Sequence, residues 1–322
     1  MGKAKNVVIL ATGGTIAGTA AHSSQSVGYS AAQLGVEQLL AAVPDLAQVA
    51  GGGLIAEQVA QLDSKDMDDA TWRHLALRCA HWLARDEVAA VVITHGTDTL
   101  EETAWFLHEA LAAHAKPVVL TCAMRPATAL LADGPQNLRD AVACAVDARA
   151  CGMLVVAAGQ VHAARAVRKQ HPYRLDAFSS GEQGPLGWVE EGRVRWQQPP
   201  DRGGAEGGCL DLLQAAGDWP WVELVSSHAG CSGRAVDALV AQGVQGLVVA
   251  ATGNGTLHHA LEAALQRALR AGVPVWLSTR CSEGQLVGSP ETASTEALQP
   301  RPVTLSPVKA RISLQLALLA KR

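Results

Sequence analysis

The sequence predicts an α/β protein with two domains. The larger N-terminal domain is expected to contain a mostly parallel mixed sheet, and the smaller C-terminal domain a parallel sheet. Apolar runs of strand length alternate with longer segments of helical periodicity, which is typical of parallel α/β architecture. A chain of 322 residues is long enough for two domains of ordinary size. Its composition, 48% hydrophobic against 17% charged, favours packed cores over disorder.

The N-terminal domain, predicted over residues 1–195, opens with the apolar run Val7–Leu10, which is typical of a short buried strand. Residues 66–85 predict a helix, because Trp72, Leu75 and Cys79 fall on one helical face and acidic residues occupy the N-terminal end. The other elements predicted here are strands over 88–93, 118–122 and 153–158, and helices over 100–114 and 137–149.

The composition of the sequence changes between about residues 179 and 217, which are rich in glycine, proline, glutamine and charged residues. This composition predicts a linker over 196–216 and leaves room for a hairpin before it. The alternation then restarts and defines the C-terminal domain over 217–322. Its predicted elements are strands over 221–226, 246–251 and 273–278, and helices over 233–241, 257–270 and 306–320.

Charge and cysteine content argue against several classes of partner. The chain has 26 basic and 30 acidic residues, which gives a formal net charge of −4. This charge gives no electrostatic reason to expect binding to nucleic acid or to a membrane. No run approaches the roughly 18 apolar residues of a spanning helix. The first residues also lack the apolar stretch of a signal peptide. The seven cysteines form no C-x-x-C pair, which favours reduced thiols, so a cytoplasmic location is expected.

Two loops, each following a buried strand, carry the prediction of function. The first, Ala11–Thr19, contains paired glycines, which let the backbone approach a ligand, and the hydroxyls of Thr12 and Thr15. The second, Thr94–Thr103, combines hydroxyls with acidic side chains. Ligands of open α/β sheets bind outside the carboxyl ends of strands, so the two loops together predict a site. Either loop alone suits a plain turn.

Signatures of other enzyme classes are absent from the sequence. It contains no P-loop, no H-E-x-x-H zinc motif and no G-x-S-x-G nucleophile elbow. Gly253–Gly255 begins like a dinucleotide-binding fingerprint, but His258 occupies the place of its third glycine. A dinucleotide cofactor is therefore poorly supported, and none of the histidines is assigned to a metal.

Thr97 and Asp98 have two interpretations on spacing alone. A hydroxyl is a weak nucleophile unless a base or a cation assists it. In the first interpretation, Asp98 faces a substrate ammonium while a lysine serves Thr97. In the second, Asp98 caps the helix that begins near Leu100.

The segments Thr12–Gly18 and Thr94–Thr103 resemble the two signatures of the bacterial-type L-asparaginase family, which includes the glutaminase-asparaginases. Residues 63–67, 123–126 and 132–135 are also similar to family segments. The resemblance implies the two-domain asparaginase-like fold and a homotetramer of intimate dimers that share active sites. It implies hydrolysis of L-asparagine to L-aspartate and ammonia through a threonine acyl-enzyme, without a cofactor. A lesser activity on glutamine stays open.

The resemblance also implies a role for individual residues. Thr15 resembles the primary nucleophile, and Tyr29 resembles its proton acceptor on a lid loop. Thr97, Asp98 and Lys169 resemble a second catalytic cluster. The residues implied to bind substrate, besides Thr97 and Asp98, are Gly14, Ser64, Lys65, Gly96, Ala123, Thr256 and Glu291, the last two from a neighbouring subunit.

Several of these residues also have plain structural interpretations. Tyr29 lies in a loop rich in serine and glycine, where a surface aromatic is ordinary. Lys169 ends a basic run that is typical of a solvated face. Ser64 suits a turn hydroxyl, and Glu291 lies in a loop where exposed acids are common.

Lys65 departs from the family pattern, in which several relatives carry Gln, Glu or Ser near the substrate ammonium. A lysine that pointed inward would repel that ammonium, whereas one that faced solvent or paired with Asp98 or Glu291 would not. The hypothesis is that Lys65 weakens substrate binding relative to a neutral residue.

Two other functions stay open at this point. One is an amidase that acts on a different amide substrate. The other is a non-catalytic amino-acid sensor, against which the pair of threonines argues, because a pure binder would not require both.

Overall fold

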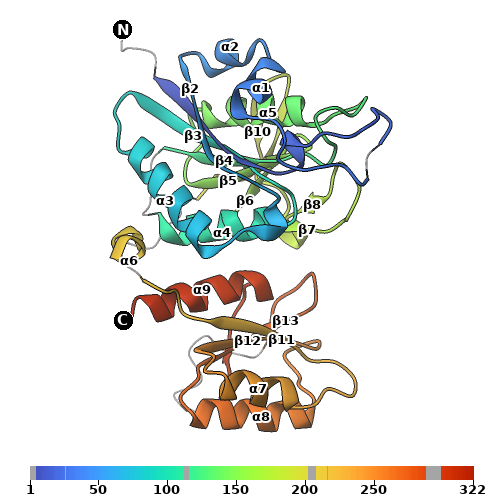
Figure 1. The fold of residues 1–322 in the computed structure, drawn as a ribbon, viewed down its shortest axis with the longest axis vertical. Helices are drawn as coiled ribbons and strands as arrows, with labels where there is room; N and C mark the ends of the chain where they lie inside the picture. Colours follow the sequence, from blue (N-terminus) through green and yellow to red (C-terminus); the bar gives the residue numbers. More distant parts are fainter. Residues whose placement is uncertain (1–4, 26, 112–115, 202–207, 216, 288–298) are drawn as a thin grey trace. The chain divides into compact units, whose positions relative to one another are not determined.

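The computed structural model describes residues 5–25, 27–111, 116–201, 208–215, 217–287 and 299–322. The chain divides into two compact units, Met1–Gln214 and Ala215–Arg322 (Figure 1). Each unit is an α/β structure, as the sequence predicts.

Within the described part of unit 1, eight strands form one sheet in the order β10-β9-β6-β5-β4-β3-β1-β2. Five neighbouring strands are parallel, and three at one side are antiparallel, which confirms the mostly parallel mixed sheet. The parallel strands are β1 (Asn6–Gly13), β2 (Leu54–Leu62), β3 (Val88–Thr94), β4 (Val118–Thr121) and β5 (Met153–Ala157). The antiparallel strands are β6 (Gln160–Ala163), β9 (Gly187–Glu190) and β10 (Arg193–Trp196).

Helices cover both faces of this sheet (Figure 1). On one face lie α1 (Val36–Ala41), α2 (Leu46–Ala50) and α5 (Gly134–Ala145), and on the other lie α3 (Asp69–Leu83) and α4 (Leu100–Ala110). The sequence of strand β1 is largely apolar because both of its faces are buried. Val7 and Ile9 pack into a cluster with Leu138 of α5, while Val8 and Leu10 are fully buried on the opposite face.

Smaller elements complete unit 1. Strands β7 (Arg168–Lys169) and β8 (Phe178–Ser179) form a separate antiparallel pair. Strands β9 and β10 form the hairpin for which the sequence left room. The short helix α6 (Leu210–Ala215), whose last residue is the first of unit 2, lies inside the segment predicted as a linker. Its six residues are too few for a periodic pattern to be recognised.

The ends of two helices differ from the prediction for local reasons. Helix α3 begins at Asp69 rather than residue 66, because the Asp68 carboxylate accepts a hydrogen bond from the Thr71 N–H at 2.8 Å and so caps the helix. Helix α5 begins at Gly134, earlier than predicted, because Pro135 suits a first helical turn.

Unit 2 contains a parallel sheet in chain order, β11 (Val222–Ser226), β12 (Gly246–Ala251), β13 (Val275–Thr279) and β14 (Arg301–Pro302). Helices α7 (Arg234–Ala241) and α8 (His259–Arg270) cover one face, and α9 (Pro307–Leu319) covers the other (Figure 1). The parallel C-terminal sheet is therefore confirmed.

Candidate active site

The candidate site begins with the topology of unit 1. Strands β2, β1, β3 and β4 are neighbours and run parallel, so their carboxyl ends meet at one edge of the sheet. Ser64, Thr15, Thr97 and Ala123 each follow the end of one of these strands. The sheet therefore gathers, at one edge, residues that are far apart in the sequence.

Two glycines let the loops interlock. Gly14 has φ +80°, and a Cβ atom added to it would lie 2.3 Å from the Gly96 Cα atom. A Cβ atom added to Gly96 would lie 2.4 Å from the Ser64 Oγ atom. Because Thr15 and Thr97 follow these touching glycines directly, the two threonine loops lie against each other. The Gly14 N–H already donates to the Leu62 carbonyl at 2.9 Å, so Gly14 acts here through close approach.

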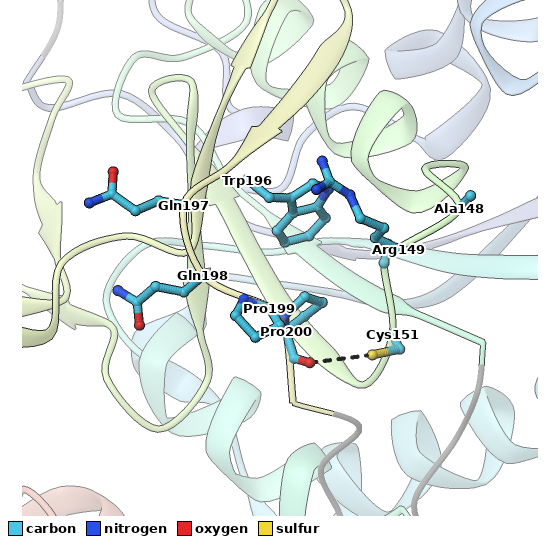
Figure 2. Close-up of a pocket in the computed structure, with 9 residues that line it drawn as sticks. Ala148, Arg149, Cys151, Trp196, Gln197, Gln198, Pro199 and Pro200 are labelled. Atoms are coloured by element: carbon cyan, nitrogen blue, oxygen red, sulfur yellow. Dashed lines mark hydrogen bonds between the residues drawn. The ribbon is translucent and has the colours of Figure 1, made fainter.

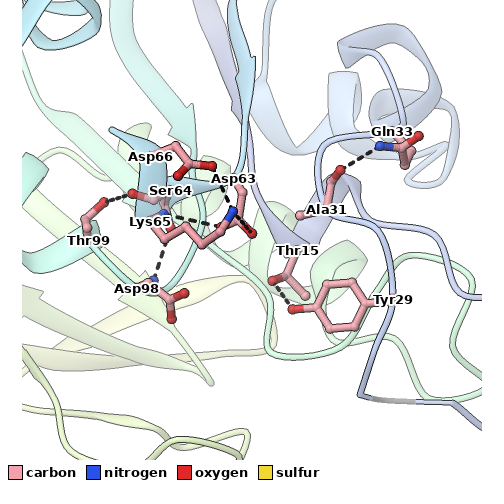
Figure 3. Close-up of polar contacts among 10 residues, drawn as sticks. All are labelled: Thr15, Tyr29, Ala31, Gln33, Asp63, Ser64, Lys65, Asp66, Asp98 and Thr99. Atoms are coloured by element: carbon pink, nitrogen blue, oxygen red, sulfur yellow. Dashed lines mark hydrogen bonds and ion pairs between the residues drawn. The ribbon is translucent and has the colours of Figure 1, made fainter. Parts of the chain in front are cut away.

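Thr15 begins a single 3-10 turn after β1, and only 6% of its surface is exposed. Its hydroxyl lies 2.5 Å from the Tyr29 hydroxyl, as Figure 3 shows. Tyr29 is half-buried, which raises the pKa of its phenol. The nearby carboxylates of Asp63, Asp98 and Asp133 raise it further, although the bond to Thr15 opposes them. Tyr29 is therefore a neutral phenol near pH 7.

Thr97 has a cationic partner. The Lys169 ammonium donates to the Thr97 hydroxyl at 2.8 Å and to the Asp98 carboxylate at 2.6 Å. The Thr97 residue is 6% exposed, the Lys169 side chain is 16% exposed, and the Asp98 side chain is 55% exposed. Lys169, the last residue of the basic run, lies in β7 and contacts the loop that contains Thr97 and Asp98. It does not lie on a solvated face.

The Asp98 carboxylate does not cap helix α4. The N-cap of that helix is Thr99, whose side chain makes no capping hydrogen bond, and the Asp98 carboxylate accepts from Lys169. The capping interpretation is therefore wrong. Ser64 is more than a turn hydroxyl, because its Oγ accepts from the Asp98 N–H at 3.2 Å and its carbonyl accepts from the Thr99 hydroxyl at 2.7 Å (Figure 3).

Lys65 turns toward carboxylates of its own loop. Its ammonium lies 3.2 Å from Asp63 and 2.8 Å from Asp66, and its side chain is 61% exposed (Figure 3). The hydrogen bonds that the Lys65 ammonium donates to Asp66 and Asp63 raise its pKa. The described partners of Lys65 are therefore Asp63 and Asp66 rather than Asp98.

Behind the Thr97 loop lies a buried polar chain that the sequence analysis missed. The Trp72 indole N–H donates to the Thr103 hydroxyl at 2.8 Å, and that hydroxyl lies 3.0 Å from His95 Nε2. His95 Nδ1 lies 2.8 Å from the Gly96 carbonyl, so Nδ1 carries the proton and Nε2 accepts from Thr103. Burial lowers the pKa of His95 to about 4, so the imidazole is neutral at pH 7. His95 lies inside the Thr94–Thr103 motif, but a single histidine there gives no sequence signal of these buried hydrogen bonds.

Asp133 was also missed as a structural anchor. Its carboxylate accepts from the main-chain N–H groups of Met124 and Arg125, each at 2.9 Å, and so holds the loop after β4. The sequence feature that could have identified Asp133 is its place directly before Gly134 and Pro135, which begin a helix. Ala123 begins that loop and is fully buried.

Two sequence-predicted residues are not among those that the described part of unit 1 brings together. Thr256 belongs to unit 2, in the turn after β12, where its hydroxyl lies 2.9 Å from the Thr252 hydroxyl. Glu291 lies outside the described residues. Among the residues that the structure does describe, no group of three or more His, Cys, Asp or Glu side chains is arranged to hold a metal ion. No described helix is long and apolar enough to cross a membrane.

A cavity of unit 1, apart from the site residues described above, has a volume of about 520 Å³ (Figure 2). Its lining includes Arg149, Cys151, Trp196 and Pro200, and none of the sequence-predicted site residues. The Cys151 thiol lies 3.7 Å from the Pro200 carbonyl across it.

Comparison with known proteins agrees with the motifs. Residues 6–202 match the family described as asparaginase, N-terminal, and residues 221–322 match the glutaminase/asparaginase C-terminal domain. L-asparaginase 2 of Escherichia coli (strain K12) is 38% identical over 315 residues, which span 97% of this chain and 88% of that protein. Glutaminase-asparaginase of Pseudomonas fluorescens biotype A is 39% identical over 287 residues, spanning 88% and 78%.

A solved structure is similar over nearly the full length of the chain. It is that of a probable cytoplasmic L-asparaginase from Campylobacter jejuni, with a TM-score of 0.89 and 37% identity over 98% of this chain and 95% of that one. The family matches together span both units of the fold. This chain is therefore a member of the asparaginase family.

Proposed function

We propose that the protein is an L-asparagine amidohydrolase, which converts L-asparagine and water into L-aspartate and ammonia. The observation that carries this proposal is the interlocking of the two threonine loops at Gly14 and Gly96. It gives one site with a hydroxyl paired to a phenol and a second hydroxyl paired to an ammonium. Relatives named L-asparaginase and glutaminase-asparaginase support the same substrate class.

The reaction proceeds in two steps. In the first, the Thr15 oxygen attacks the side-chain amide carbon, and the C–N bond breaks as nitrogen leaves with its two hydrogens and the former hydroxyl proton, as ammonia. In the second, water adds to the resulting ester, its hydroxyl stays on the carbonyl carbon, and its proton returns to Thr15. A covalent intermediate thus divides one difficult step into two easier ones.

Tyr29 relays the proton of Thr15. Because its phenol is neutral near pH 7, it takes up that proton only as it releases its own toward the departing nitrogen. General acid–base assistance of this kind contributes about 10²–10⁴ in rate.

The second cluster suits the charged ends of the substrate. The Asp98 carboxylate is partly exposed and is the group we assign to the substrate ammonium. Ser64, which accepts from the Asp98 N–H, keeps its hydroxyl proton for the substrate carboxylate. The Lys169 ammonium donates to both the Thr97 hydroxyl oxygen and the Asp98 carboxylate, so it presents these two groups to the substrate together.

Ammonia release from asparagine and glutamine, measured side by side, tests the proposal. We expect turnover of asparagine, with Thr15→Ala and Thr97→Ala each reducing it by several orders of magnitude while the fold persists. Turnover of a different amide alone would favour the amidase reading. Binding of asparagine without ammonia release would favour the sensor.

We further propose a homotetramer of intimate dimers, in which Thr256 and Glu291 of one subunit complete the site of the next. The support for this assembly is the family resemblance of these positions. For location we propose the cytoplasm, on the grounds of cysteine content. The Campylobacter jejuni relative is named as cytoplasmic, and a Haemophilus influenzae relative is named as periplasmic.

A further inference from the structure

We propose that Thr128 is a positioning residue that holds Tyr29 against Thr15. It does so by fastening residues 18–30, here called the Tyr29 loop, of which residue 26 lies outside the described part. The role of Tyr29 itself rests on the proposed function, whereas the fastening of the loop can be measured without substrate.

The position of Tyr29 follows from the position of the first residues of its loop. Thr19 and Ser30 form a two-way bridge, in which each main-chain N–H donates to the other's carbonyl, at 2.8 and 2.9 Å. Tyr29 directly precedes this bridge. Its ring also packs against Gly18, where an added Cβ atom would lie 3.1 Å from the Tyr29 Cδ2 atom. A shift of Gly18 and Thr19 would therefore move the phenol away from Thr15.

Those first residues are fastened to residues 124–130, here called the anchor loop, by three hydrogen bonds. The Ala127 N–H donates to the Gly18 carbonyl, and the Leu130 N–H donates to the Ser23 carbonyl, each at 2.9 Å. The third bond runs from the Ala20 N–H to the Thr128 hydroxyl oxygen, at 2.8 Å. Of the three, only the Thr128 bond uses a side chain, so a single substitution removes it and leaves the other two in place.

The anchor loop is itself held to the core of unit 1. The Asp133 carboxylate accepts from the Met124 and Arg125 N–H groups at 2.9 Å. The Asn137 side chain of α5, which is 4% exposed, donates to the same carboxylate at 3.2 Å. The anchor loop thus transmits the position of a packed helix to the Tyr29 loop.

Most of the described residues of the Tyr29 loop are exposed. Val27 is 70% exposed, and the residues from Ala21 to Ser24 are exposed as well. Segments with little buried surface open at low free energy, so the loss of one bond changes the open population measurably. A net hydrogen bond shifts such an equilibrium by about two- to tenfold.

The test compares three variants of the full chain. Thr128→Val keeps the shape of the side chain but removes the acceptor, Thr128→Ser keeps the hydroxyl, and Leu130→Ala alters an exposed neighbour whose N–H bond is retained. Hydrogen exchange of residues 18–25 is measured without substrate. We expect about two- to tenfold faster exchange in Thr128→Val, with wild-type exchange in the other two and unchanged protection in residues 134–145 of all three.

Activity gives the second measurement. We expect kcat/KM on asparagine to fall by about the same two- to tenfold in Thr128→Val and to be restored in Thr128→Ser. In a Tyr29→Phe background the same Thr128→Val change should have almost no effect, because its influence acts through the Tyr29 hydroxyl.

Three results separate the possibilities. Wild-type exchange and wild-type kcat/KM in Thr128→Val would overturn the proposal. So would an equal loss of activity with and without the Tyr29 hydroxyl, since Thr128 would then act by another route. If the wild-type protein released no ammonia from any amide, the proposed function would fail, while the exchange measurement would still decide whether Thr128 fastens the loop.

Discussion

Thr15 and Thr97 differ from ordinary threonines through their surroundings. Both are 6% exposed, and each hydroxyl has a different partner, the Tyr29 phenol in one case and the Lys169 ammonium in the other. The sequence predicted both threonines from their motifs. It could not establish Lys169, because a basic run predicts solvent exposure until β7 and β8 are known to direct its last residue inward.

Lys65 is expected to weaken binding of a substrate ammonium, even though it pairs with Asp63 and Asp66. Lys65→Gln would leave those two carboxylates without their cation, so the local potential becomes more negative and KM for asparagine should fall. Steady-state kinetics measure this change, with Lys65→Arg as a control that keeps the charge. An unchanged KM in Lys65→Gln would refute the hypothesis.

His95 is expected to make the stability of unit 1 sensitive to mildly acidic pH. Its pKa is about 4 in the folded chain, below the 6.5 expected when unfolded, so the unfolded state binds more protons between these values. This contribution is complete above pH 6.5 and is lost as pH falls toward 4. From pH 7 to 5 the loss is about 2 kcal/mol in free energy of unfolding.

Urea unfolding at the two pH values measures this effect. The pH dependence should be shallower in His95→Gln than in the wild type, while His22→Gln, at an exposed position, should retain the wild-type dependence. Equal slopes for His95→Gln and the wild type would show that His95 is not held neutral in the fold.

At the scale of elements, the site is a consequence of parallel strands. The sequence predicted β1, β3 and β4 as apolar runs and placed the two signature loops after the first two of them. It could not predict that Gly14 and Gly96 touch, because this depends on the side-by-side pairing of β1 and β3. It also missed α6, whose length is below what periodicity detects.

Gly96→Ala is expected to separate the two threonine loops. The added methyl group would lie 2.4 Å from Ser64 Oγ and 3.2 Å from the Gly14 Cα, so a loop must shift. Overpacking of this kind costs about 1–3 kcal/mol in stability, and we expect a larger proportional loss of kcat than of folded protein. Gly35→Ala serves as control, since φ is −77° there and its Cβ would meet nothing within 4 Å. Wild-type kcat in Gly96→Ala would show that the interlocking is dispensable.

At the scale of the whole molecule, the two α/β units and the direction of both sheets follow from the alternation of apolar runs and helical segments. The assembly does not follow from it. An interface is specified by surface residues that carry no periodic signal, so Thr256 and Glu291 were assigned to a neighbouring subunit from the family resemblance alone.

The proposed tetramer predicts that activity per chain falls when the protein is diluted. If Thr256 and Glu291 complete a neighbour's site, dissociated chains lack part of their substrate contacts. Light scattering and ammonia release, followed over the same dilution series, should decline together. Full activity in a solution of monomers would rule out a shared site.

The most direct test of the central claim, that two threonine loops form one amide-hydrolysing site, is trapping of the covalent intermediate. Protein is mixed with asparagine, quenched in acid within a turnover, digested and examined by mass spectrometry. We expect an aspartyl ester on the peptide that contains Thr15, and none in Thr15→Ala. Ammonia release without any ester at Thr15, or an ester on a residue outside the two loops, would contradict the account.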